Sequence, residues 1–372
     1  MKVIVIGAGV IGASIAFRMA ETGAEVTLVE ALRVGSGTSS TSYAWVNACE
    51  KLTSRSYFDL NYAGVKAHRR IAGEIEGANW FHRPGVVQWK DSGAEASGFD
   101  KGDFDKLERL KSWGYPAESI DAATLSELEP EVDSSTFSEE GAIYYPEDGW
   151  LDAPVYAGAI VARAQRHHGM RLVTGKKVER LLTRSGRAVG VLLADGTEIL
   201  ADQVVNSAGR WANDAVGDAE YGLPLAPTVG LIAYTTSCDS SLRHALRTPL
   251  VNCRPDGAGR ILLRSNDIDK TVPIDAEAVP SHPSAQELLS RMIKLMPSLE
   301  GLHVEAVRTA IRPIPRDGLS AIGRHPALEN YYVTVTHSGV TLGAFLGEAV
   351  RDEVIHGRSV PELAEFRPAR FF

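Results

Sequence analysis

The chain has 372 residues, which is long enough for two domains with a large buried core. Hydrophobic residues make up 44% and charged residues 23%, as in an ordinary globular protein, and the net charge of -8 argues against nucleic acid as a partner. Cys49, Cys238 and Cys253 show no ligand-like spacing, so we predict no disulfide framework and no metal site. No apolar run is long enough to span a bilayer and none of signal type precedes the first motif, so we expect a cytoplasmic protein without integral membrane contact.

Residues 2–31, KVIVIGAGVIGASIAFRMAETGAEVTLVEA, predict a strand, a glycine-rich turn, a helix and a second strand. The first strand, residues 3–6, is apolar throughout, as is typical of a parallel strand covered on both faces. The helix has an apolar face and ends at Gly23, and residues 26–29 form the next strand. This order of elements is typical of a unit that binds a dinucleotide.

The glycines of this unit have separate tasks. Gly7 permits the tight turn, Gly9 lets the backbone approach a pyrophosphate, and Gly12 lets the helix pack on the strand. The phosphates then lie at the helix N-terminus, where free N–H groups and the helix dipole favour anions. Glu30, at the end of the second strand, is placed to accept hydrogen bonds from ribose hydroxyls and disfavours NADP. The alternative is a glycine-rich turn kept for packing alone. We predict further cofactor contacts from Val10, Ile11 and Ala31.

Residues 34–48, VGSGTSSTSYAWVNA, form a loop rich in glycine and hydroxyl groups that ends in aromatic residues. Such a loop suits a second phosphate and the ribityl chain of a flavin, although a solvated surface loop has the same composition. Tyr43 and Trp45 are candidates to line the isoalloxazine ring, or they belong to the core. The predicted cofactor contacts of the loop are Ser36, Gly37, Thr38, Ser39 and Ser42.

The middle of the chain predicts a helix and then a change of sheet. Residues 56–76 have a helical pattern, residues 81–90 are expected to enter a different sheet, and residues 91–141 mix a loop with one or two helices. A further helix starts after the cap Asp152 and ends at Gly169. Four strands follow it, at residues 171–174, 177–184, 187–194 and 203–206, with hairpin turns at 185–186 and 195–196.

The last third predicts more strands and two helices. Strands are expected within GLPLAPTVGLIAYTT, residues 222–236, and within GRILLRSND, residues 259–267. A helix over residues 284–296 stops before Pro297. Residues 332–336 predict a strand, and after the turn HSG residues 340–355 predict the last helix.

Two segments resemble the D-amino-acid oxidase superfamily of FAD-dependent oxidoreductases. One is ADQVVNSAGRWANDAVG, residues 201–217, in which a strand ends in an Ala-Gly turn. The other is IRPIPRDGLSAIGRHPALENYYVTVTHSGVTLGAFLGEAV, residues 311–350, with Arg-Pro, Asp-Gly, Ile-Gly and His-x-Gly-x-Thr in the family's order. The resemblance covers residues 1–50 and 144 to the end, and it implies FAD as the cofactor. It places Ala208 and Gly209 close to FAD, Trp211 at the start of the next helix, and the backbone of Val178 against adenine.

The resemblance also implies an α/β fold, with a Rossmann-type FAD-binding domain (glutathione-reductase-like) and an interleaved α+β substrate domain built on an antiparallel sheet. We predict that residues 1–80, 144–220 and 310–372 form the FAD-binding domain, and residues 81–143 and 221–309 the substrate domain. Family members that hold flavin covalently use a cysteine near the C-terminal motif or a histidine in the early loop. Residues 312–345 contain no cysteine and residues 34–48 no histidine, so we predict non-covalent FAD.

The start of the last helix is expected to stabilise charge on the flavin. Ser338, Gly339, Val340 and Thr341 form its N-terminus, where free N–H groups can stabilise the anion that grows on reduced flavin. His337 precedes them, either as a turn-capping residue or as a group beside the flavin. We count His337 among the catalytic candidates.

A substrate carboxylate calls for an arginine fork, and the resemblance places Arg312 at that position. Its alternative is a salt bridge on a strand; Arg308 lies on the same face of the strand, and Arg316 is a weaker candidate. Tyr234 lies on the strand that the family uses for a tyrosine over the substrate, or it is one more aromatic in a sheet. The role of Arg264 is open.

These candidates predict an FAD-dependent enzyme that oxidises the C–N bond of an amino acid or small amine. Hydride passes from Cα to flavin N5, and the resulting imine hydrolyses. Alternatives are an FAD-dependent 2-hydroxy-acid dehydrogenase, a flavin subunit of a heteromeric amine or amino-acid dehydrogenase, and an NAD-dependent dehydrogenase. The expected partner is a small carboxylate-bearing amine; the electron acceptor and the oligomeric state stay open.

Overall fold

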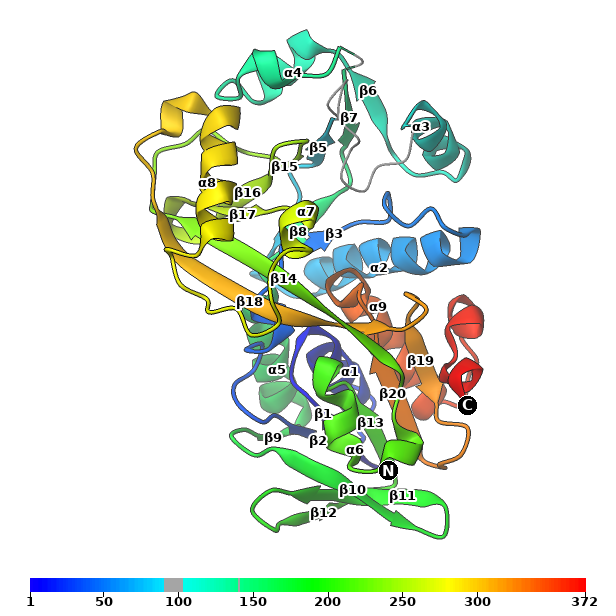
Figure 1. Ribbon diagram of the computed structural model, residues 1–372. Helices are drawn as coiled ribbons and strands as arrows, with labels where there is room; N and C mark the ends of the chain where they lie inside the picture. The colour runs from blue at the N-terminus through cyan, green and yellow to red at the C-terminus, as the bar shows by residue number, and fades with distance from the viewer. Residues whose placement is uncertain (90–102, 140) are drawn as a thin grey trace.

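The computed structural model describes residues 1–89, 103–139 and 141–372, and two large β-sheets organise them (Figure 1). The predicted loop that begins at residue 91 lies largely outside the described residues. In Figure 1 one sheet lies below and the other above, and the long strands β14 (Leu225–Thr235) and β18 (Val304–Pro315) run between the two regions.

The lower sheet has six strands in the order β19-β20-β13-β1-β2-β9. Neighbouring strands are parallel except for the antiparallel pair β19 and β20. The strands are β1 (Lys2–Ile6), β2 (Glu25–Val29), β9 (Arg171–Val173), β13 (Gln203–Asn206), β19 (Ala321–Arg324) and β20 (Tyr331–Val335). The sheet thus joins segments from the start, the middle and the end of the chain.

Both faces of the six-stranded sheet are covered, which explains the apolar run of β1. Val3 and Val5 pack with helices α1 (Val10–Ala20), α5 (Ala153–His168) and α9 (Gly339–Val354). Ile4 and Ile6 belong to the core on the other face. Helix α6 (Ala212–Val216) and a three-stranded sheet of β10 (Val178–Arg184), β11 (Arg187–Leu193) and β12 (Glu198–Leu200) cover that second face.

The predicted hairpin turns are present, and in the segment between residues 171 and 206 one strand was missed. Ser185 and Gly186 both have a positive φ, 49° and 74°, as a two-residue turn between twisted strands requires. Strand β12 follows the second turn and was not expected, because its three residues are too short for a periodic pattern. Asp152 precedes α5 as expected but makes no capping hydrogen bond; its carboxylate lies 2.9 Å from Nε2 of His82.

The upper sheet has eight strands in the order β18-β14-β17-β16-β15-β5-β7-β6. Its neighbours are antiparallel, as predicted, except that β15 and β5 are parallel. Its other strands are β5 (Val86–Gln88), β6 (Glu118–Ile120), β7 (Ala142–Tyr145), β15 (Ala245–Arg247), β16 (Asn252–Asp256) and β17 (Arg260–Arg264). Helix α8 (Pro283–Leu295) packs on one face with Leu231, Ala233 and Leu263, and α7 (Asn266–Asp269) follows β17.

The remaining elements surround the junction of the two sheets. Helix α2 (Arg55–Glu74) packs along α9, and a small sheet of β3 (Trp45–Val46), β8 (Gly149–Leu151) and β4 (Phe81–His82) lies beside it. Helices α3 (Asp103–Ser112) and α4 (Ala122–Leu128) lie at the far end of the upper sheet (Figure 1).

Two of the predicted domain limits need correction. Residue 144 lies inside β7 and residue 310 inside β18, and both strands belong to the eight-stranded sheet. A domain limit inside a continuous strand is unphysical, because the strand's hydrogen bonds hold it in one sheet. The division of the chain into an FAD-binding and a substrate part otherwise stays a prediction.

Candidate functional site

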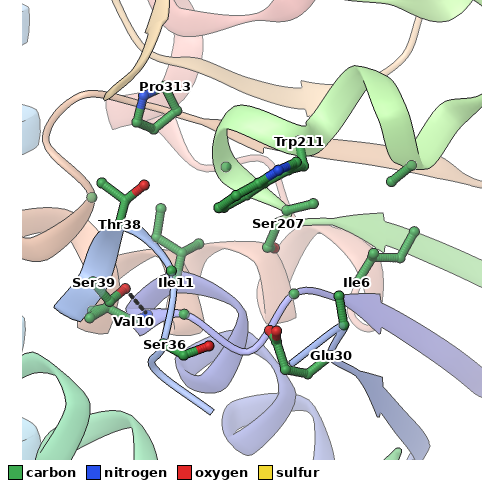
Figure 2. Close-up of a pocket in the computed structure, with 18 of the residues that line it drawn as sticks. Ile6, Val10, Ile11, Glu30, Ser36, Thr38, Ser39, Ser207, Trp211 and Pro313 are labelled. Atoms are coloured by element: carbon green, nitrogen blue, oxygen red, sulfur yellow. Dashed lines mark hydrogen bonds between the residues drawn. The ribbon is translucent and has the colours of Figure 1, made fainter. Parts of the chain in front are cut away.

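A cavity of about 400 Å³ opens at the carboxyl ends of the parallel strands (Figure 2). Its wall combines the turn after β1, the loop after β2, the turn after β13 and the start of α9. Among the predicted cofactor residues, those that line it are Gly7, Gly9, Val10, Ile11, Glu30, Ala31, Ser36, Gly37, Thr38, Ser39, Ser42, Val178, Ala208, Gly209, Trp211, Gly339 and Val340. Such a crevice at strand ends is where open α/β sheets bind ligands.

The glycine turn after β1 has no room for larger residues. Gly7 has a φ of +90°, and a Cβ there would lie 2.7 Å from the carbonyl oxygen of Ser207. A Cβ on Gly12 would lie 1.8 Å from the carbonyl oxygen of Gly7, so the helix can approach the turn only with glycine. The first helical hydrogen bond joins the N–H of Ala13 to the carbonyl of Gly9 at 2.9 Å. The N–H groups of Ile11 and Gly12, which precede Ala13, are therefore outside the helical ladder and suit a phosphate.

The carboxylate of Glu30 is fixed at the end of β2. One oxygen accepts a hydrogen bond from the N–H of Ala8, and the other accepts from the N–H of Leu32, each at 2.8 Å. Figure 2 shows Glu30 in the cavity wall beside the glycine turn. Each carboxylate oxygen keeps acceptor capacity, which ribose hydroxyls can use.

The hydroxyl-rich loop is tied to its surroundings and forms part of the cavity wall (Figure 2). Ser39 Oγ accepts a hydrogen bond from the N–H of Val10 at 3.1 Å, and Thr38 Oγ1 donates to the carbonyl of Ile311 at 3.4 Å. Arg308 Nη1 donates to the carbonyl of Ser40 at 2.9 Å. These contacts disfavour the alternative of a solvated surface loop.

The turn after β13 brings a large aromatic ring to the cavity. The N–H of Ala208 donates to Oδ1 of Asn206 at 3.0 Å, and Gly209 adopts a positive φ of 59°. Figure 2 shows the Trp211 ring projecting over the cavity, and a Cβ on Gly37 would lie 3.3 Å from that ring. Trp211 and the hydroxyl-rich loop therefore form facing parts of one wall.

Helix α9 starts at the cavity, but only part of the predicted set lines it. The N–H of Leu342 makes the first helical bond, to Ser338 at 2.9 Å, so the preceding three N–H groups lie outside the ladder. Ser338 differs from the prediction, because its N–H donates to Thr336 Oγ1 at 3.0 Å and its side chain is buried. Thr341 is also buried, and its hydroxyl donates to the carbonyl of Trp45 at 3.2 Å. Both hydroxyls are satisfied inside the protein and do not line the cavity.

His337 lines the cavity beside this helix start. The ring is exposed to the cavity but lies deep among protein atoms, and Lys51, Arg312 and Arg264 are the charged groups around it. Desolvation first, and then repulsion by these cations, lower the pKa of His337 to about 3. His337 is therefore neutral at physiological pH.

Arg312 and Tyr234 lie on the eight-stranded sheet and not in the wall of this cavity. Arg312 Nη2 forms an ion pair with Asp269, which also binds Arg264 at 2.7 Å. Arg312 thus forms the salt bridge that was the alternative to a substrate contact, and its partner, which the sequence did not indicate, is Asp269. Burial raises the pKa of Tyr234, whose ring is flanked by the guanidinium of Arg308 at 5.4 Å. The neighbour of Arg312, Pro313, does line the cavity.

Several lining residues were not predicted. They include Ile6, Val29, Leu32, Lys176, Lys177, Ser207, Asp214, Ala215, Pro313 and Thr336. Most are direct neighbours of predicted residues in the sequence, so they could have been predicted from their position beside each motif. Lys176 lies before β10 and carries an ion pair with Asp195, which no motif indicates.

The residues of the cavity match the chemistry of FAD. Free N–H groups suit the pyrophosphate, Glu30 suits a ribose, and Val178 with Trp211 offers apolar surface for rings. No described helix has the length and apolar character that crossing a membrane requires.

Comparison with known proteins identifies the family. A model of the family described as FAD dependent oxidoreductase (DAO) matches residues 2–353. Glycine oxidase of Geobacillus kaustophilus (strain HTA426) is 26% identical over 378 residues, covering 99% of this chain and 96% of the relative. Glycine oxidase of Bacillus licheniformis is 24% identical over 357 residues, covering 95% and 92%.

Solved structures share the fold. The glycine oxidase structure from Geobacillus kaustophilus gives a TM-score of 0.83 at 24% identity, covering 100% of this chain and 98% of that one. The L-proline dehydrogenase structure from P. horikoshii gives 0.83 at 21% identity, covering 100% and 97%. The predicted α/β FAD-binding fold and FAD as the predicted cofactor are confirmed. The chain belongs to the family of FAD dependent oxidoreductases, and its cofactor is FAD.

Proposed function

We propose that this flavoenzyme oxidises the C–N bond of an amine that carries a carboxylate. The observation that carries the proposal is the group of cations around His337: Arg312, Arg264 and Lys51. His337 and Pro313 line the cavity near the start of α9, and Pro313 directly follows Arg312 on β18. A carboxylate is the common partner of such a group, since guanidinium binds it through two parallel hydrogen bonds.

Bound FAD would supply the acceptor for the two electrons and the hydrogen lost as the Cα–N bond of the substrate is oxidised, and the substrate would leave as an imine that water hydrolyses. The chain's own residues have three tasks in this reaction. They bind the carboxylate, they keep the amine neutral, and they hold negative charge at the start of α9.

The cations favour the neutral amine that the reaction needs. An ammonium group beside Arg312, Arg264 and Lys51 meets like charges, which lower its pKa. His337 also stays neutral, mainly because of burial and then because of these cations, so it adds no positive charge of its own. The nitrogen lone pair is then available near neutral pH without a strong general base.

The first turn of α9 is held rigidly where it meets the cavity. His68 of helix α2 is buried, and its Nε2 donates to the carbonyl of Val340 at 2.7 Å. The N–H groups of Gly339 and Val340 therefore have a fixed direction, as electrostatic stabilisation of a developing anion requires. These side chains and amides support the proposal and are its candidate catalytic groups, together with Arg312, Tyr234 and His337.

Anaerobic reduction of the purified yellow protein tests the proposal. We expect flavin absorbance to bleach with primary or secondary amino acids, and not with matched amines that lack the carboxylate. Bleaching only with 2-hydroxy acids would establish the hydroxy-acid alternative instead. Dye reduction only in the presence of a second subunit would indicate a heteromeric dehydrogenase. The rate of reoxidation in air then distinguishes an oxidase from a dehydrogenase.

A further inference from the structure

One face of the eight-stranded sheet carries a row of arginines. In the register of β15, β16 and β17, Arg247 stands opposite Asn252, and Asn252 stands opposite Arg264. Residues directly opposite each other in neighbouring strands point to the same face. Arg247 and Arg264 therefore share a face, with Asn252 between them.

Arg312 belongs to the same face. Tyr234 stands opposite Leu262, two residues before Arg264, and Thr228, six residues before Tyr234, stands opposite Arg312. The even spacings keep all of these side chains on one side of the sheet. Helix α8 covers the opposite side, so the arginine face looks away from α8 and toward the cofactor part of the molecule.

The charges on this face do not balance. Asp269 is 4% exposed, accepts a hydrogen bond from the N–H of Leu231 at 2.8 Å, and faces both Arg264 and Arg312. One carboxylate thus forms ion pairs with two guanidinium groups. Lys51, which lies near His337 and not on the sheet, adds a third cation, and within residues 1–89, 103–139 and 141–372 it forms no ion pair. Arg264, Arg312 and Lys51 against Asp269 alone leave an excess of two positive charges, without counting Arg247 of the same row.

The cations are near one another and not merely on one face. Arg264 has its pKa lowered by burial, while Asp269 raises it and both Arg312 and Arg247 lower it. Arg247 lies over the ring of Trp45, with its guanidinium carbon 4.5 Å from the ring centroid, at the end of the loop that lines the cofactor cavity. Cations gathered in one partly buried place repel one another unless anions offset them, so a ligand with two negative charges fits this place.

We propose that the substrate is an amine that carries two carboxylates, such as an imino- or amino-dicarboxylic acid. This inference rests on the proposed function and specifies its substrate class. Arg312 binds the carboxylate next to the oxidised carbon, and Arg264 binds the second one. Asp269 holds both guanidinium groups in place, so that they act as one preorganised site.

The test compares two thioether analogues that have no amine to oxidise. Thiodiacetate has two carboxylates, and methylthioacetate is its counterpart with one. Binding to the FAD-loaded protein is followed by calorimetry and by the change in the flavin spectrum. We expect thiodiacetate to bind roughly ten- to hundredfold more tightly, because it adds a second charge-assisted pair.

Variants assign the second carboxylate to its residue. Arg264→Met is expected to weaken thiodiacetate binding about tenfold or more and to leave methylthioacetate unchanged. Arg260→Met, on the same strand but paired with Asp256 at 2.9 Å, is the matched control and is expected to change neither. FAD content of each variant reports whether the protein is folded. If Arg264→Met does not fold, the ratio of the wild-type affinities for thiodiacetate and methylthioacetate still tests the inference.

Equal affinity of the wild type for both analogues would overturn the inference. An equal loss of affinity for both analogues in Arg264→Met would also overturn it. In either case, bleaching by monocarboxylic amines would leave the proposed function standing. Absence of bleaching by every amine would instead overturn the proposed function itself.

Discussion

Replacing Arg312 with methionine separates its two interactions, with Asp269 and with the substrate. Methionine keeps the length and apolar part of the side chain and removes the charge. Arg312 is 21% exposed, and only its Nη2 bonds to Asp269, so in the described part of the chain Nε and Nη1 have no partner. These two nitrogens are the donors that a substrate carboxylate would use.

The structure sets the expected size of the effect. Asp269 keeps Arg264, whose Nε and Nη2 lie 3.0 and 2.7 Å away, and it keeps the N–H of Leu231. No charge is left unpaired by the substitution, so we expect the fold and the FAD content to survive. The loss falls on substrate binding and amounts to about 3 kcal/mol for a charge-assisted pair, or roughly a hundredfold in Kd.

Anaerobic stopped-flow reduction over a range of substrate concentrations measures this directly, because it separates Kd from the limiting rate. Arg316→Met is the matched control, since Arg316 follows β18 and is exposed. An unchanged Kd in Arg312→Met would refute the assignment of Arg312 to the substrate. A similar loss in Arg316→Met would show that the effect is general electrostatics.

Three further changes test other parts of the structure. Glu30→Gln is expected to raise the Kd for FAD roughly tenfold, measured by titrating apoprotein, because an amide group must face one of the two N–H donors. His68 has a pKa lowered by burial to about 4 from 6.5, so the unfolded chain binds a proton first as the pH falls. About 3 kcal/mol of unfolding free energy should therefore disappear between pH 6.5 and pH 4 in the wild type, and little in His68→Gln, by chemical denaturation. Gly347→Ala should cost roughly 1–3 kcal/mol, because its Cβ would lie 2.7 Å from the carbonyl oxygen of Ser14. The control Gly158→Ala meets nothing within 4 Å on α5, and thermal melts should show a gain of about 0.5–1 kcal/mol.

Short sequence motifs predicted most of the residues that line the cofactor cavity, because the backbone conformation of each motif is determined by its own residues. The glycine turn, Glu30 and the Ala-Gly turn at residues 208–209 are contiguous with the strands that place them, and parallel strands end at one edge. Ser338 and Thr341 were predicted as cofactor contacts through the N–H groups of the helix start, and their side chains do not line the cavity. Their hydroxyls bond to groups that only the folded structure brings near, which no spacing reveals.

The substrate side could be predicted only in part. The position of Arg312 was found from the family pattern, but its partner Asp269 lies 43 residues away on a four-residue helix without a periodic signal. The row of Arg247, Asn252 and Arg264 depends on the register of three strands, and that register is a property of the assembled sheet. The domain limits predicted at residues 144 and 310 fall inside strands for a similar reason, because strand bounds in the assembled sheet are not visible in the sequence.

The strand order of the six-stranded sheet has a consequence for protein synthesis. β1 and β2 emerge within the first 29 residues, but β20, which pairs with β13, ends only at residue 335. At ~5–20 residues per second the ribosome needs roughly 15 to 60 s to cross that interval, during which the growing chain has no finished flavin cavity. A copy that stops before β20 and the start of α9 lacks part of this cavity, so the yellow colour of a preparation reports how many of its molecules extend past this point and have assembled correctly.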